Sequence, residues 1–143
     1  LEKNGITTAP NLTQCFEADF DGDGKLEQIV AANTPKNENY VPSFVEDGTK
    51  ETDGIGSYAV ALFVDDNGSA KPVFSEIRPF EGEENAYMHY NQNIVINGVY
   101  DINGDGNYDV CIVYADWENG HVLVSAMDEK GDYQTVLRGN FGA

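Results

Sequence analysis

The stretch "DINGDGNYDVCIVY", Asp101 to Tyr114, places a cluster of oxygen-bearing side chains directly before a run of strand-forming residues. A second stretch, "DFDGDGKLEQIVAAN" from Asp19 to Asn33, has the same arrangement 82 residues earlier in the chain. Asp, Asn and Gly favour tight turns, whereas β-branched and aromatic residues favour strands. Each stretch therefore predicts an acidic loop followed by a strand.

The spacing of the acidic residues indicates a cation site in each loop. Counted from the first Asp, oxygen-bearing side chains stand at positions 1, 3, 5 and 9, and a Gly stands at position 6. Ca²⁺ takes about six to eight oxygen ligands, and the Gly allows a sharp turn that directs the next carbonyl inward. The predicted ligands are Asp19, Asp21, Asp23, the carbonyl of Lys25 and Glu27 in the first loop, and Asp101, Asn103, Asp105, the carbonyl of Asn107 and Asp109 in the second.

Three other interpretations of the loops are available: an EF-hand, a dockerin and a pair of metal-free turns. An EF-hand requires a Glu at position 12 on a following helix, but position 12 is Val30 in one loop and Ile112 in the other. A dockerin fails for the same reason. A pair of metal-free Asp/Gly turns is the third alternative, and the repetition of the whole pattern argues against it. An all-protein oxygen cage favours Ca²⁺ over Mg²⁺, so the sequence predicts two Ca²⁺ sites.

The internal similarity extends beyond the loops and predicts an all-β fold. Each loop is preceded by one candidate strand and followed by three more, and the last two are joined by a turn containing Gly68 or Gly131. The prediction is one all-β domain, residues 1–143, built from two four-stranded antiparallel meanders at about 12–77 and 94–139. The expected segments are 12–18, 27–33 and 58–76 in the first repeat, and 94–100, 109–115 and 121–139 in the second.

Several local features refine this arrangement. Pro72 cannot donate a ladder hydrogen bond, which places its strand at a sheet edge. The "ENG" at 118–120 is expected to form a turn. The middle strands "AVALFV" and "VCIVY" are apolar on both faces, so both faces should be covered. Residues 33–56 form an insertion that is expected to be a loop, either functional or simply tolerated.

This combination resembles the FG-GAP/VCBS class of repeats, which form the blades of integrin-type β-propellers. The resemblance implies a calcium loop between the first two strands of each repeat, with Glu27 departing from the usual Asp. It covers neither the insertion nor Ile77 to Asn93, and the FG and GAP signatures are absent unless the C-terminal "NFGA" begins one. Closed propellers need about four to eight blades. Two repeats therefore indicate either part of a larger assembly or a compact sandwich, and solubility favours the sandwich.

Composition limits the partners of the chain. The 25 acidic and 8 basic residues give a net charge of −17, which argues against nucleic acids and anionic membrane surfaces. No apolar run approaches the ~20 residues of a membrane span. Cys15 and Cys111 either pair with each other or lie as two buried thiols. A calcium-dependent fold suits an extracellular, cell-surface or periplasmic location, where calcium is abundant.

Residue chemistry favours a binding role over catalysis. The chain has no GxSxG nucleophile elbow, phosphate-binding loop or zinc-ligand cluster, so it is not expected to be an enzyme. The expectation is a calcium-stabilised adhesion or binding module for a protein or glycan, with self-association through exposed sheet faces as a further option. Alternatives are a calcium-rigidified spacer of a larger surface protein and a carboxylate-based glycan-active enzyme. The candidate residues are Tyr87, Tyr90 and Trp117 for binding, and Glu81, Glu83, Glu84 and His89 for catalysis.

Overall fold

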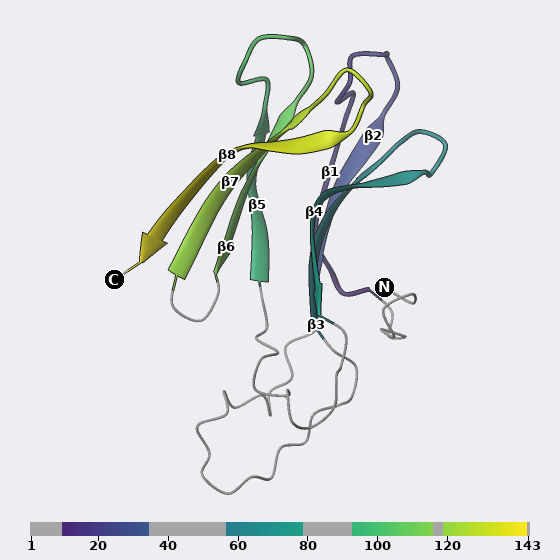
Figure 1. The fold of residues 1–143 in the computed structure, drawn as a ribbon. Helices are drawn as coiled ribbons and strands as arrows, with labels where there is room; N and C mark the ends of the chain where they lie inside the picture. The colour runs from purple at the N-terminus through teal and green to yellow at the C-terminus, as the bar shows by residue number, and fades with distance from the viewer. Residues whose placement is uncertain (1–9, 35–56, 79–92, 116–118, 143) are drawn as a thin grey trace, which may run out of the picture.

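The computed structural model describes residues 10–34, 57–78, 93–115 and 119–142, and these form two four-stranded antiparallel sheets that pack face to face (Figure 1). This part of the chain is all-β and forms a sandwich rather than a closed barrel. The first sheet contains β1 (Leu12–Ala18), β2 (Glu27–Asn33), β3 (Ser57–Val64) and β4 (Ala70–Arg78); the second contains β5 (Asn93–Tyr100), β6 (Asp109–Ala115), β7 (Asn119–Met127) and β8 (Tyr133–Gly142).

Each sheet is a meander in which neighbouring strands follow one another in the sequence, as predicted. Pro72 lies in β4, at an edge of the first sheet, which confirms the position expected for it. The expected turn at 118–120 is wrong in part, because Asn119 and Gly120 belong to β7 and Gly120 pairs with Ala115. Strand pairing continues through Gly120 because glycine can adopt extended backbone as readily as a turn.

The two sheets share the details expected of a repeat. The β3–β4 and β7–β8 turns have the same backbone hydrogen bonds, from Gly68 to Asp65 and from Gly131 to Asp128. Both turns place their Gly at positive φ, where residues with a Cβ are disfavoured. Each hairpin also shifts register at the same place, after Ala61 in β3 and after Val124 in β7. These matches fix which residues of the two hairpins are equivalent. The register of β2 on β3 differs by two residues from that of β6 on β7, since Ile29 lies opposite Phe63 and Cys111 opposite Val124, and a shift of two leaves the same side chains on the same face.

The core lies between the sheets, and the two sheets contribute opposite faces to it. We call the face containing Ile29 and Ala61 the front of the first sheet; its equivalents in the second sheet are Cys111 and Val124. Ile29, Ala31, Ala61 and Phe63 are buried against Val110, Ile112 and Leu123, which are on the back of the second sheet. The front of one repeat therefore packs on the back of the other.

Two side-chain amides close the free edge of β5 against the first sheet. Gln14 accepts a hydrogen bond from the Ile96 N–H at 2.7 Å and donates one to the Ile96 carbonyl at 3.1 Å. Asn33 does the same for Ile94, with distances of 2.9 and 3.2 Å. Each amide thus takes the place of a neighbouring strand, which satisfies buried backbone groups at an edge that would otherwise be unpaired.

The outer faces depart from the prediction that both sides of the middle strands are covered. On the second sheet, Cys111, Val113 and Val124 are only half-buried. On the first sheet, Ala32, Tyr58 and Val60 form a separate buried cluster, and Val30 and Leu62 are half-buried. The inner apolar side chains of these strands are therefore buried in the core, whereas their outer apolar side chains are only partly covered.

The two cysteines fit neither predicted arrangement. Both are free; Cys15 is exposed, and Cys111 is half-buried. Cys15 pairs with Val30 on the back of the first sheet, whereas Cys111 is on the front of the second. Since these are the two outer faces of the sandwich, the core separates the thiols. A disulfide within one chain is therefore incompatible with this packing.

Candidate metal centre

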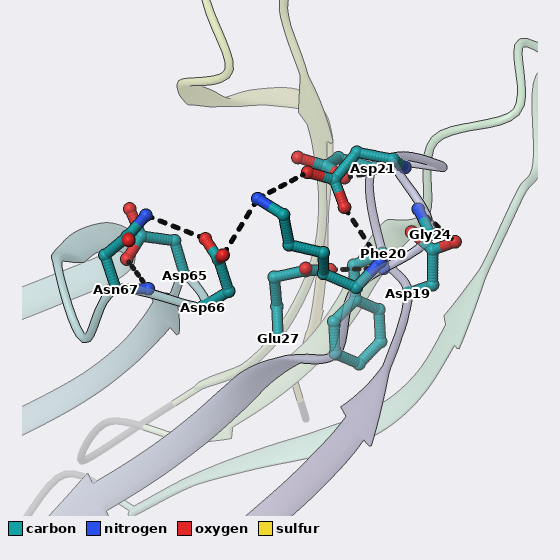
Figure 2. Close-up of polar contacts among 10 residues, drawn as sticks. Asp19, Phe20, Asp21, Gly24, Glu27, Asp65, Asp66 and Asn67 are labelled. Atoms are coloured by element: carbon teal, nitrogen blue, oxygen red, sulfur yellow. Dashed lines mark hydrogen bonds and ion pairs between the residues drawn. The ribbon is translucent and has the colours of Figure 1, made fainter.

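The first acidic loop connects β1 to β2 and gathers four carboxylates. Each of Asp19, Asp21, Asp23 and Glu27 offers an oxygen atom, and these oxygens all lie within 4.8 Å of one another. Gly22 and Gly24 adopt positive φ values of 76° and 88°, which lets the chain curl tightly around the carboxylates. Figure 2 shows Asp19, Asp21 and Glu27 approaching one another from different parts of this loop. Such a cluster can hold a metal ion.

Backbone N–H groups hold one oxygen of each carboxylate in place. Asp19 Oδ2 accepts from Gly24 at 3.0 Å, and Glu27 Oε2 accepts from Phe20 at 2.8 Å (Figure 2). Asp21 and Asp23 each accept the N–H two residues further along, at 3.2 and 2.9 Å. Because one oxygen of each side chain is used to shape the loop, the other oxygen of Asp19, Asp21 and Glu27 can face a common ligand, whereas the second oxygen of Asp23 is paired with Lys25 at 3.3 Å.

Asp19 supplies the observation that best distinguishes a cation site from an ordinary turn. Its Oδ1 is shielded from solvent and accepts no hydrogen bond. A buried carboxylate oxygen without a partner is strongly destabilising, because burial removes its water without replacement. A bound cation at the centre of the four carboxylates would provide the missing interaction, so the donor set and this oxygen both fit a hard metal ion.

Glu27 is buried at the base of the loop, with 3% of its surface exposed. Burial raises the pKa of its carboxyl group, the N–H of Phe20 partly opposes this, and the negative charges of Asp21, Asp23 and Asp19 raise the pKa further. Burial and the three neighbouring carboxylates thus all disfavour a negative charge on Glu27. A divalent cation would reverse the balance by favouring the ionised carboxylate.

The second loop, between β5 and β6, reproduces the backbone of the first. Gly104 and Gly106 have φ values of 77° and 91°, and Gly106 donates to Asp101 as Gly24 donates to Asp19. Asp109 is buried and accepts from Ile102, as Glu27 accepts from Phe20. The two predicted loops therefore share one hydrogen-bonding plan.

The side chains of the second loop are arranged differently from those of the first. Asp101 Oδ1 accepts from both Gly104 and Asp105, and Asn103 donates its amide to Asp105 Oδ2 at 2.8 Å. Asp105 is exposed, and hydrogen bonds from the Asn107 backbone and the Asn103 side chain lower its pKa. The oxygens of this loop are thus largely used within the loop, and the only carboxylate cluster found among the described residues is the one in the first loop.

The two loops contact each other. Tyr108 donates its N–H to the carbonyl of Phe20 at 3.0 Å, and their rings pack edge to face with centroids 5.9 Å apart. Gly22 lies so close to the second loop that a Cβ at this position would be 3.7 Å from the Gly106 carbonyl oxygen. The two acidic pockets are therefore neighbours at one end of the sandwich, although the sequence separates them widely.

The β3–β4 turn joins this acidic end. Lys25 forms ion pairs with Asp66 at 2.8 Å and with Asp23 at 3.3 Å, and these two carboxylates raise its pKa. Figure 2 shows the turn containing Asp65, Asp66 and Asn67 beside the first loop. The Lys25 side chain is thus a local counter-ion. Its link to Asp66 was not predicted, because nothing in the sequence shows that these turns come together.

Some of the other predicted residues lie among the described residues, and others do not. The backbone carbonyls of Lys25 and Asn107 belong to the two loops. Glu27 and Asp109 are the first residues of β2 and β6, and the other predicted carboxylate and amide positions lie in the loops. The binding candidates Tyr87, Tyr90 and Trp117 and the catalytic candidates Glu81, Glu83, Glu84 and His89 fall in 79–92 and 116–118, beyond the described residues. Most of the insertion, residues 35–56, does so as well.

Comparison with known proteins gives no further assignment: no protein-family model, curated protein or solved structure matches the chain. Within the described residues, no helix has the length and apolar character to cross a membrane. The geometry of the acidic end therefore carries the functional argument.

Proposed function

We propose that the chain is a calcium-stabilised, non-catalytic binding module that works outside the cytosol. The observation that carries the proposal is the shielded Asp19 Oδ1 among four converging carboxylates. Ca²⁺ suits this donor set better than Mg²⁺, because it accepts many protein oxygens in flexible geometry. The resemblance of both loops to FG-GAP/VCBS repeats supports the same ion.

The second loop is proposed as a second Ca²⁺ site. Its backbone hydrogen bonds match those of the first loop, and Asp101, Asn103, Asp105 and Asp109 hold the equivalent positions. Occupation would require the Asn103 amide to release Asp105 Oδ2 so that this oxygen can face the ion. The second loop supplies three carboxylates where the first supplies four, so the second site is expected to bind more weakly than the first.

A binding role is favoured over a spacer role by the surface. A spacer needs only the ions and a polar exterior, but the second sheet exposes Tyr100, Leu137 and Phe141. Exposed apolar groups gathered on one face are typical of interaction sites. The proposed ligand class is a protein or glycan, and the weaker alternative of an enzyme has no support from the described residues.

Titration calorimetry and thermal unfolding test the metal proposal directly. Ca²⁺ should bind with measurable heat and raise the melting temperature by several degrees relative to chelator, because a ligand of the folded state stabilises it. Asp19→Asn should weaken binding at the tighter site. Glu129→Gln removes one charge from the exposed β7–β8 turn and serves as the control. Identical melting curves with calcium and with chelator would refute the proposal.

A further inference from the structure

The front of the second sheet is an apolar surface that no other described segment of the chain packs against. Val95, Leu137 and Phe141 expose 48%, 55% and 55% of their surface, and Cys111 and Val124 are half-buried beside them. Strand pairing places these side chains on one face: Val124 opposite Leu137, and Gly120 opposite Phe141. The ring of Phe141 lies over Gly120, since a Cβ added there would overlap it.

The equivalent face of the first sheet is not exposed. Ile29 and Ala61 are the counterparts of Cys111 and Val124, and both are fully buried against the back of the second sheet. The same strand positions are therefore covered in one repeat and open in the other. The chain itself shows what covers this kind of face: the back of a neighbouring repeat.

A matching back face is available on the first sheet. Ile112 and Leu123, which receive the front of the first sheet, have Val30 and Val60 as their counterparts. Val60 is already buried with Ala32 and Tyr58, but Val30, Leu62 and Val64 remain half-buried toward the acidic end. The sandwich thus has one open front and one partly open back, on opposite outer surfaces.

We propose that a second copy of this chain binds to the open front of the second sheet through the back of its own first sheet. Val124 and Leu137 of one copy would then contact Val30 and Leu62 of the other, repeating the packing inside each chain. A front-to-back contact is heterologous, so in a pair of copies one keeps a free back and the other keeps a free front, and repetition produces either a closed ring or an open chain.

This inference deepens the proposed binding role by naming the partner, but it does not depend on the metal. Calcium binding is judged by heat and melting temperature, whereas self-association is judged by molar mass. A chain that binds Ca²⁺ and remains monomeric would retain the first proposal and lose the second. A chain that self-associates but does not bind Ca²⁺ would refute the calcium proposal and retain the self-association proposal.

Sedimentation of the full chain in calcium buffer over a range of concentrations tests the contact. The wild type should form dimers or larger species. Leu137→Asp and Val124→Asp should each weaken association by about tenfold or more, because a buried unpaired charge opposes an apolar contact. Thr135→Asp adds the same charge to an exposed position on the opposite face of β8 and should leave association unchanged. A monomeric wild type, or association insensitive to both substitutions, would overturn the proposal.

The native cysteines distinguish front-to-back pairing from pairing of two identical faces. Cys15 is on the back of the first sheet and Cys111 on the front of the second. A short thiol cross-linker should join Cys111→Ser to Cys15→Ser when the two variants are mixed and should not join either variant to itself. Cross-linking of Cys15→Ser alone would show two fronts in contact and overturn the proposal. This arm also decides the matter if the aspartate variants fail to fold.

Discussion

At the scale of single residues, the acidic end combines groups that are individually unfavourable. Glu27 is buried, Asp19 has an oxygen without a partner, and Asp21 and Asp23 bring further negative charge close to both. Repulsion between carboxylates is strong where water is excluded. These residues are therefore expected to limit the stability of the metal-free protein and to increase its stability when a cation is bound.

Substitution of Glu27 should separate these two effects. Glu27→Gln removes a buried charge, so the metal-free protein should become more stable, whereas Ca²⁺ affinity should fall by about tenfold or more because a charged ligand is lost. Chemical unfolding in chelator and calorimetry with Ca²⁺ measure the two quantities. A variant that is less stable in chelator would contradict this account of Glu27.

The raised pKa of Glu27 also predicts how stability changes with pH. An acid whose pKa is higher in the folded state binds more protons when folded, so its contribution to stability falls as pH rises above its ordinary value of 4.5. In chelator, acidification from neutral toward that value should therefore stabilise the wild type. With saturating Ca²⁺ the trend should reverse, because protons compete with the ion. Glu27→Gln should flatten the chelator profile, and an unchanged profile would count against the assignment.

At the scale of strands and loops, the sequence predicted most of what the structure shows. The bounds of β1, β2 and β6 match the predicted strands, because turn residues and β-branched runs alternate sharply in the chain. The side-chain arrangement of the second loop was less predictable. Its oxygen positions follow the spacing, but hydrogen bonds from Asn103 and nearby N–H groups decide where these oxygens point. Spacing alone carries no such information.

The loop glycines offer a test at this scale. Gly24 has a φ of 88° and open space around its Cβ direction, so Gly24→Ala introduces backbone strain without a clash. The loss should be about 1–2 kcal/mol of unfolding free energy. Gly24→Asn should recover part of it, since Asn tolerates positive φ better than Ala. Denaturant unfolding measures both, and equal stability of the two variants would contradict a purely conformational effect.

The amide that closes the edge of β5 gives a second element-level prediction. Asn33→Leu leaves the buried N–H and carbonyl of Ile94 without partners, which should cost about 1–3 kcal/mol. Gln28→Leu, at an exposed position on the same strand, is the matched control. Hydrogen exchange at the Ile94 amide should accelerate in Asn33→Leu. Unchanged protection there would show that Asn33 does not secure this edge.

At the scale of the whole molecule, the fold depends on which faces meet, and this was beyond sequence reasoning. The apolar pattern of "AVALFV" and "VCIVY" indicates that both faces of each sheet are apolar, but it does not show which face of one repeat packs on which face of the other. Only the equivalence of Ile29 with Cys111, and of Ala61 with Val124, shows the front-to-back arrangement. The approach of Lys25 to Asp66 depends on the same three-dimensional placement.

Net charge gives the prediction that belongs to this scale. With a charge of −17, the metal-free chain repels itself, and screening by salt should reduce that repulsion. Added sodium chloride should therefore raise the melting temperature in chelator, and do so less in saturating calcium, because bound Ca²⁺ removes the repulsion among the carboxylates of the first loop while most of the net charge remains. Thermal unfolding across a salt series measures this, and equal slopes under both conditions would argue against electrostatic strain in the metal-free state.

The hydrogen bond from Tyr108 to the Phe20 carbonyl spans only 3.0 Å between the two loops. Order that a cation imposes on one pocket can reach the other through this hydrogen bond, the ring contact next to it and the close approach of Gly22 to Gly106. If both loops bind calcium as proposed, filling of the pair should then proceed over a narrower range of calcium concentration than two independent pockets allow. The protein would respond to calcium as a threshold detector rather than as a proportional buffer.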